Sequence, residues 1–205
     1  MIGFNTVEGE FSYQVIIERS KFICYLKGIE NEDQAKEYIN SIKKINSLAN
    51  HNCYAYIADE QGLIMKFSDD CEPQGTAGLP MLEVLKNKRL YKTVAVVTRY
   101  FGGTLLGTGG LVRAYTDASK EALKNCETKL MQRLIPVDIK SNYTDMGKIQ
   151  YILNTNSVNI LDTEFTDEVV FKTEIPVIIS DRIISEITEA TGARAILDIK
   201  DEIFG

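Results

Sequence analysis

Three carboxylates, Asp69, Asp70 and Glu72, stand within four residues of one another in a segment rich in turn-forming residues. Carboxylates this close repel one another unless they are solvated, paired with cations or bound to a metal ion. The segment is therefore either a solvated acidic turn or a site where these groups pair with Arg99 or Arg113 or hold a hard cation. Because the spacing matches no complete set of metal ligands, we expect no metal site.

A second segment, residues 99–115, is rich in glycine and carries an arginine near each end. Glycines let backbone N–H groups converge on a ligand, and the start of a following helix adds partial positive charge. The segment therefore predicts a cradle for phosphate or carboxylate, although a tight strand-to-helix corner would use the same residue types. Its spacing fits neither a Walker A loop nor a dinucleotide-binding fingerprint. The predicted anion-binding residues here are Arg99, Gly102, Gly103, Gly107, Gly109, Gly110 and Arg113.

His51 is the only histidine, so every zinc motif that needs two histidines is excluded. It could act as a general acid or base, or it could serve as a polar cap at the start of a strand. The four cysteines are widely spaced without a C-x-x-C pair, which predicts reduced thiols and no cofactor. If the protein were an enzyme, its catalytic groups would be His51, Asp69, Asp70 and Glu72.

Regular elements must position these segments. The hydrophobic pattern predicts a buried strand over residues 93–98 and an amphipathic helix over 111–126, on either side of the glycine-rich loop. The other elements predicted upstream are one or two strands within residues 11–26, a helix over 31–46 capped by Asn31, and strands over 53–58 and 63–67. A further helix is predicted over residues 81–87, directly after Pro80.

The net charge of −6 is unevenly distributed along the chain. Residues 1–130 hold 16 basic and 16 acidic side chains, whereas residues 131–205 hold 7 and 13. Residues 84–116 contain no acid, so a locally cationic surface is compatible with an acidic protein. Such a surface could bind RNA phosphates. The basic residues of this stretch are Lys86, Lys88, Arg89, Lys92, Arg99 and Arg113.

The C-terminal third has a compact, regular pattern. Its predicted elements follow the β-α-β-β-α-β order of ferredoxin-like folds. They are a strand over residues 135–139, a helix over 144–154, strands over 158–165 and 168–179, a helix over 181–191 and a strand over 194–199. We therefore predict an α+β protein with two domains, residues 1–132 and 133–205.

Composition places the chain among ordinary globular proteins, with 44% hydrophobic and 25% charged residues. No apolar run approaches the length of a transmembrane helix, and the first residues lack the pattern of a signal peptide. We therefore expect a cytoplasmic protein with no membrane partner.

Together, these segments resemble a bacterial two-domain member of the IMPACT/YigZ family over the full length of the chain. The resemblance rests on Ser20-Lys21-Phe22, on residues 51–56 and on the SDDCEPQGTAG and RYFGGTLLGTGGLVRAY stretches. It implies an N-terminal domain of the type that is found in the fourth domain of elongation factor G, and also in RNase PH and in GHMP kinases. It also implies a ferredoxin-like C-terminal domain like those of elongation factors.

The resemblance also carries functional expectations. Eukaryotic IMPACT proteins regulate translation initiation by competing for the activator of a stress kinase, a partner system that bacteria lack. For bacterial members the expectation is binding to RNA, the ribosome or another translation component.

Two positions depart from the family pattern. Cys71 stands where the family usually has glycine, and a side chain there disfavours a left-handed backbone. Leu105 stands where a lysine is common, so one potential phosphate contact is missing.

Two hypotheses follow. In the first, the protein is a non-catalytic, translation-associated regulator that binds RNA, the ribosome or a translation factor through the basic, glycine-rich surface. In the second, it is an enzyme that acts on a small phosphorylated or carboxylated substrate in a cleft between the acidic and glycine-rich loops. We favour the first because the sequence has no recognisable nucleophile with its base.

Overall fold

The computed structural model describes residues 3–205, which form two units. Contacts divide this part of the chain into residues 3–130 and 131–205. Each unit combines helices with a sheet, so the predicted α+β class is confirmed. None of the helices formed by the described residues is long and apolar enough to span a membrane.

A five-stranded antiparallel sheet forms the centre of the N-terminal unit. Its strand order is β2-β3-β6-β4-β5, so β6 lies in the middle. Every residue of β6 except the last is buried, as its continuous apolar run predicts. The strands are β2 (Glu10–Ile17), β3 (Ser20–Gly28), β4 (His51–Ile57), β5 (Met65–Ser68) and β6 (Thr93–Tyr100).

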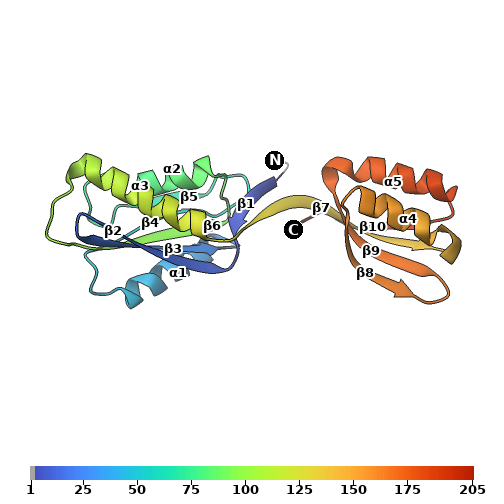
Figure 1. The fold of residues 1–205 in the computed structure, drawn as a ribbon, viewed down its shortest axis with the longest axis horizontal. Coiled ribbons are helices and arrows are strands. Elements are labelled where there is room, and N and C mark those ends of the chain that lie inside the picture. Colours follow the sequence, from blue (N-terminus) through green and yellow to red (C-terminus); the bar gives the residue numbers. More distant parts are fainter. Residues whose placement is uncertain (1–2) are drawn as a thin grey trace. The chain divides into compact units, whose positions relative to one another are not determined.

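Helices cover both faces of this sheet (Figure 1). On one face, α2 (Gly78–Asn87) and α3 (Gly107–Asn125) pack on alternate residues of β3, β4 and β6 around Phe22 and Tyr115. On the other face, α1 (Glu32–Ile45) buries a smaller cluster that includes Tyr56. The helices thereby hold the ends of β4 and β6 in fixed positions beside the start of α3.

The boundaries of the N-terminal elements differ from the predicted ones in a consistent way. The cap of α1 is confirmed, since the Asn31 side chain accepts a hydrogen bond from the Gln34 N–H. By contrast, α2 begins three residues and α3 four residues earlier than predicted. The last three glycines of the glycine-rich segment therefore lie in the first turn of α3. A short strand, β1 (Gly3–Val7), was not predicted; it bridges Asn5 to Leu90.

The C-terminal unit follows the predicted order of elements. Its strands pair antiparallel in the order β10-β7-β9-β8, and β11 also pairs with β7. This topology is consistent with a ferredoxin-like fold. The elements are β7 (Thr128–Ser141), α4 (Tyr143–Thr155), β8 (Asn159–Phe165), β9 (Val169–Pro176), α5 (Val177–Thr191), β10 (Ile196–Ile199) and β11 (Ile203–Phe204).

The strand predicted over residues 168–179 is too long, because α5 begins at Val177 directly after Pro176. Proline lacks an N–H and fixes φ, so it suits the start of a helix better than a strand. The two helices cover one face of the sheet, around Ile149, Phe171 and Ile183. Figure 1 shows α4 and α5 together on that face.

Candidate functional site

The acidic loop and the glycine-rich loop converge on one cavity of about 470 Å³ in the N-terminal unit. Antiparallel pairing of β4 with β6 sets His51 opposite Arg99, and Glu72 reaches the same place from the acidic loop. The first residues of α3 complete the wall. The cavity is lined by Asn50, His51, Glu72, Pro73, Arg99, Phe101, Leu105, Leu106, Gly107, Thr108 and Leu111.

A buried ion pair lies at this cavity. The Arg99 guanidinium donates to the Glu72 carboxylate at 2.7 Å, and the two side chains are only 6% and 4% exposed. The Tyr115 hydroxyl donates to the same carboxylate oxygen at 2.8 Å. Of the alternatives weighed for the acidic segment, pairing of Glu72 with Arg99 is therefore confirmed. Arg99 is consequently a buried, paired group and not a free surface cation.

Asp69 has a structural task beside the cavity. Its carboxylate accepts hydrogen bonds from the backbone N–H groups of Gly75, Ala77 and Gly78, at 2.8 to 3.0 Å. These bonds satisfy donors at the start of α2, and a negative charge there also suits the helix dipole. This contact explains why α2 begins earlier than its hydrophobic pattern predicts.

Hydrogen bonds hold both Asp70 and the His51 ring in place. The Asp70 carboxylate accepts from the Asn52 N–H at 2.7 Å and from Lys43 at 2.8 Å. His51 Nδ1 lies 2.8 Å from the Asp70 carbonyl oxygen, which can only accept, so Nδ1 carries the hydrogen. Nε2 lies 3.8 Å from a carboxylate oxygen of Glu72, and it carries the lone pair whenever the ring is neutral.

Two further protonated groups lie behind the ion pair. The Cys53 thiol donates to the Asp69 carbonyl at 3.0 Å and lies 3.4 Å from the Tyr115 hydroxyl. Burial is the main cause that raises the pKa of Cys53 and the pKa of Tyr115. Both groups stay protonated at neutral pH, so Cys53 does not supply a thiolate nucleophile.

The glycines of the glycine-rich segment serve different purposes. A Cβ on Gly102 would lie 1.9 Å from the Arg19 carbonyl oxygen, so only glycine fits there. Gly103 and Gly107 have positive φ angles, of 86° and 68°. In contrast, a Cβ on Gly109 would meet nothing within 4 Å. The fold therefore excludes a side chain at Gly102 and favours glycine at Gly103 and Gly107, but it does not require glycine at Gly109.

The other predicted cations lie apart from this cavity. Arg113 is exposed and lines a neighbouring hollow that also contains Glu18 and Asp117. The cationic residues from 86 to 92 lie at and beyond the C-terminal end of α2, whereas Asp69 caps its N-terminal end. Of these, Lys86 pairs with Glu83 and Lys92 with Glu30, whereas Lys88 and Arg89 are exposed without an ion pair among the described residues.

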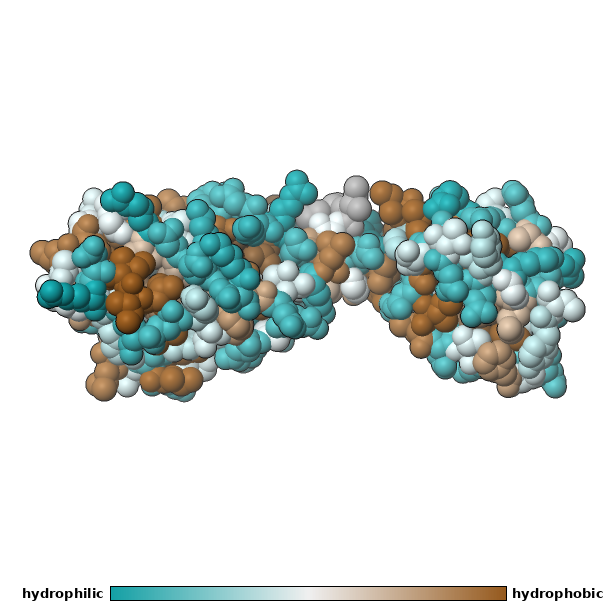
Figure 2. All heavy atoms as spheres, viewed as in Figure 1, coloured by the Kyte–Doolittle hydropathy of each residue, from teal (hydrophilic) through white to brown (hydrophobic). Residues whose placement is uncertain are grey.

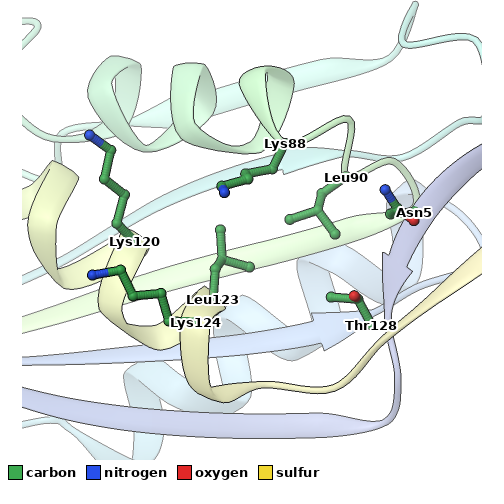
Figure 3. Close-up of a pocket in the computed structure, with 7 residues that line it drawn as sticks. All are labelled: Asn5, Lys88, Leu90, Lys120, Leu123, Lys124 and Thr128. Carbon is green, nitrogen blue, oxygen red and sulfur yellow. The ribbon is translucent and has the colours of Figure 1, made fainter.

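Lys88 belongs to a second cavity, of about 320 Å³, which we call the lysine groove (Figure 3). Figure 3 shows Lys88 extending from the end of α2 toward the side of α3 that carries Lys120 and Lys124. Leu90 and Leu123 supply apolar lining. Asn5 and Thr128 also line the groove, and no acidic side chain does.

Some residues of these sites were not predicted. Tyr115 is not among the predicted site residues, yet its hydroxyl donates to Glu72. A buried tyrosine generally needs a hydrogen-bond partner, which is a signal that sequence reading could have used. Lys120 and Lys124 are likewise not among the predicted cationic residues, because nothing in their spacing relates them to Lys88. Among residues 3–205 no group of three His, Cys, Asp or Glu side chains could hold a metal ion.

Comparison with known proteins gives the chain clear relatives. Residues 18–123 match the model of the Impact N-terminal domain, and residues 139–194 match a domain of unknown function, DUF1949. The chain is 41% identical to "IMPACT family member YvyE" of Bacillus subtilis, over 97% of this chain and 91% of that protein. It is 35% identical to "IMPACT family member YigZ" of Escherichia coli, over 78% and 79% of the two chains.

The match to a eukaryotic relative covers a shorter part of the chain. The chain is 36% identical to "Protein IMPACT-B" of Xenopus tropicalis over 43% of this chain and 29% of that protein. Among solved structures, it resembles one titled "Crystal structure of an hypothetical protein". That structure has a TM-score of 0.63, 28% sequence identity and coverage of 96% and 97% of the two chains. These comparisons bear out the resemblance that the motifs indicate.

Proposed function

Because the chain belongs to the IMPACT family, we propose that it is a non-catalytic, translation-associated protein that binds RNA through the lysine groove. The observation that carries this proposal is the meeting of Lys88, Lys120 and Lys124 around one cavity without an acidic side chain in its lining. Cationic side chains beside a hollow attract phosphates, and phosphate contacts supply most of the affinity of sequence-independent RNA binding.

The charge of the groove supports this assignment over the surface predicted from the sequence. Lys88 and Lys120 have no ion-pair partner among residues 3–205, and Lys124 pairs only with Glu121 on its own helix. An exposed pair of this kind is weak, so Lys124 remains available to a phosphate. Arg99, by contrast, is committed to Glu72 inside the protein.

The alternative of an enzyme has no support in the comparisons. In the described part of the chain, His51 contacts Asp70 and Glu72 rather than a serine or cysteine. Catalysis by a covalent nucleophile would need a serine or cysteine activated by this histidine, and among residues 3–205 the structure places neither beside it.

The test is the salt dependence of binding to a ribosomal RNA fragment. Lys88→Ala with Lys120→Ala removes two unpaired cations from the groove. A matched control, Lys44→Ala with Lys140→Ala, removes two exposed lysines that have no ion pair and lie elsewhere. The groove variant should lower the slope of log affinity against log salt by roughly 1.4, at about 0.7 per lost contact with a single strand. Equal slopes for the two variants would reject the groove as the RNA site.

A further inference from the structure

We propose that the lysine groove binds an unpaired nucleotide of a single-stranded RNA. The phosphates would lie at the lysines, the base against Leu90 and Leu123, and the edge of the base at the Asn5 side chain. This assignment rests on the proposed function of the groove and adds to it the form of RNA that the groove accepts.

The floor of the groove is apolar. It is formed by Leu90, which is 2% exposed and belongs to the hydrophobic core, and by Leu123, which packs against the same core. In Figure 3 the two leucine side chains extend toward each other near Lys88. An apolar floor offers nothing to a phosphate, whereas the face of a nucleobase gains free energy when it leaves water for an apolar surface. The volume of about 320 Å³ lies at the lower end of the range for small-ligand sites, which suits a single base.

The Asn5 side chain gives an independent indication of a base. The backbone of Asn5 is held beside Leu90, because its N–H donates to the Arg89 carbonyl at 3.0 Å and its carbonyl accepts from the Tyr91 N–H at 2.9 Å. Asn5 is half-buried at the Leu90 end of the groove, and its side-chain amide has no hydrogen-bond partner among residues 3–205 (Figure 3). An amide offers an acceptor and two donors in one plane, a pattern that pairs with the edge of a base. The fixed backbone therefore holds an unused donor and acceptor beside the apolar floor.

Lysines border this floor on two sides. Lys120 and Lys124 lie four residues apart on α3, so they follow one another along the same face of the helix. Figure 2 shows hydrophilic side chains over the C-terminal half of α3, where both lysines lie. Lys88 extends toward them from the end of α2 (Figure 3). A strand that places its phosphates along α3 would therefore present its bases to the leucine floor.

A double helix does not satisfy this arrangement. Its bases are stacked, and their pairing edges are engaged with the opposite strand. The major groove of an RNA duplex is also too deep and narrow for side chains to read its bases. A single strand, in contrast, can turn a base out of the stack and place it on a protein surface. The leucine floor and the free amide of Asn5 therefore favour a single strand over a duplex.

The experiment compares three probes of equal length at one salt concentration, by fluorescence anisotropy with the full chain. They are a single-stranded RNA without self-complementarity, its duplex with the complementary strand, and a ribose-phosphate strand without bases. The single strand should bind at least about tenfold more tightly than either of the others, because only its bases can leave the stack and enter the groove. Equal affinity for the single strand and the duplex, or for the strands with and without bases, would overturn the proposal.

Two variants test the role of Asn5. Asn5→Ala removes the amide and leaves both backbone hydrogen bonds in place. It should weaken binding of the single strand by about tenfold and leave the slope of log affinity against log salt unchanged, because no charge is lost. Asn40→Ala removes an exposed amide without a hydrogen-bond partner among the described residues from α1, on the other face of the sheet. This control should bind like the unaltered protein, and equal affinity of the two variants for the single strand would overturn the proposal.

The lysine variants distinguish failure of this assignment from failure of the proposed function. If Lys88→Ala with Lys120→Ala lowers the salt slope but the single strand and the duplex bind equally, the groove binds RNA through phosphates alone and the base assignment is wrong. If the same variant behaves like its lysine control, the RNA assignment itself is wrong, and the base assignment fails with it.

Discussion

Arg99 and Glu72 form a salt bridge of 2.7 Å in which both side chains are almost completely buried. The arginine comes from the end of the central strand and the glutamate from the acidic loop, 27 residues earlier in the chain. Phe22 and Phe101 lie 5.4 and 5.5 Å from the guanidinium carbon. The pair therefore connects the two loops that form the cavity.

Removal of this arginine should strongly destabilise the protein. Arg99→Ala leaves Glu72 as a buried charge without its partner, which typically costs about 3–5 kcal/mol. The measurement is the free energy of unfolding from urea titration. Arg133→Ala breaks the more exposed pair with Glu202 and serves as a control that should cost less than about 1 kcal/mol. If both variants lost a similar free energy of unfolding, burial of the Arg99–Glu72 pair would not explain its contribution to stability.

Cys71 should be a source of backbone strain. Its φ of 69° lies in the left-handed region, where the family usually has glycine. The sequence predicts that a side chain disfavours this conformation, and the structure shows that the backbone adopts it nonetheless. Cys71→Gly should therefore be more stable than Cys71→Ala by about 1–2 kcal/mol in thermal unfolding. An alanine variant as stable as the glycine variant would show that no strain is stored here.

Two glycines of the glycine-rich segment should respond in opposite directions to the same substitution. Gly102→Ala would force a Cβ against the Arg19 carbonyl and should destabilise the protein by at least about 1–3 kcal/mol. Gly109→Ala fills open space in a helix and should stabilise it by about 0.5–1 kcal/mol. Chemical denaturation of both variants checks this, and destabilisation by Gly109→Ala would refute the open-space assignment.

The C-terminal unit should lose stability in acid through Asp145. Hydrogen bonds from Arg194 and Lys148 lower the pKa of this carboxyl from 3.8 to about 2. Since the folded pKa lies below the unfolded one, the stabilisation is complete above pH about 4 and is lost as the pH falls toward about 2. Arg194→Gln should raise the pKa of Asp145, which carboxyl NMR titration measures directly.

A control for this pH effect lies in the same unit. Arg182→Gln breaks only an exposed ion pair with Glu186, in which the charged atoms are 3.9 Å apart. It should leave the NMR titration of Asp145 unchanged. An equal rise in the pKa of Asp145 for both arginine variants would show that overall charge, and not the direct contact, controls this carboxyl.

Local sequence patterns predicted most of the regular elements. Alternation in residues 11–26 corresponds to β2 and β3, and the continuous apolar run at residues 93–98 corresponds to the buried centre of β6. The starts of α2 and α3 were missed, because their first turns contain glycine and proline. The start of α2 depends on Asp69, a capping carboxylate nine residues before Gly78, which a local pattern does not reveal.

The sequence by itself determined the element types and the family, because hydrophobic periodicity and the long glycine-rich motif are local properties. It also singled out His51, Glu72 and Arg99 by residue type, but it did not show that they line one cavity. Only the tertiary structure decided their roles. Pairing of β4 with β6 brings distant residues together and buries Arg99 against Glu72, whereas packing of α2 on α3 brings Lys88 beside Lys120. Burial and partner choice depend on these long-range contacts, so a residue's charge in the sequence did not reveal whether that charge is free.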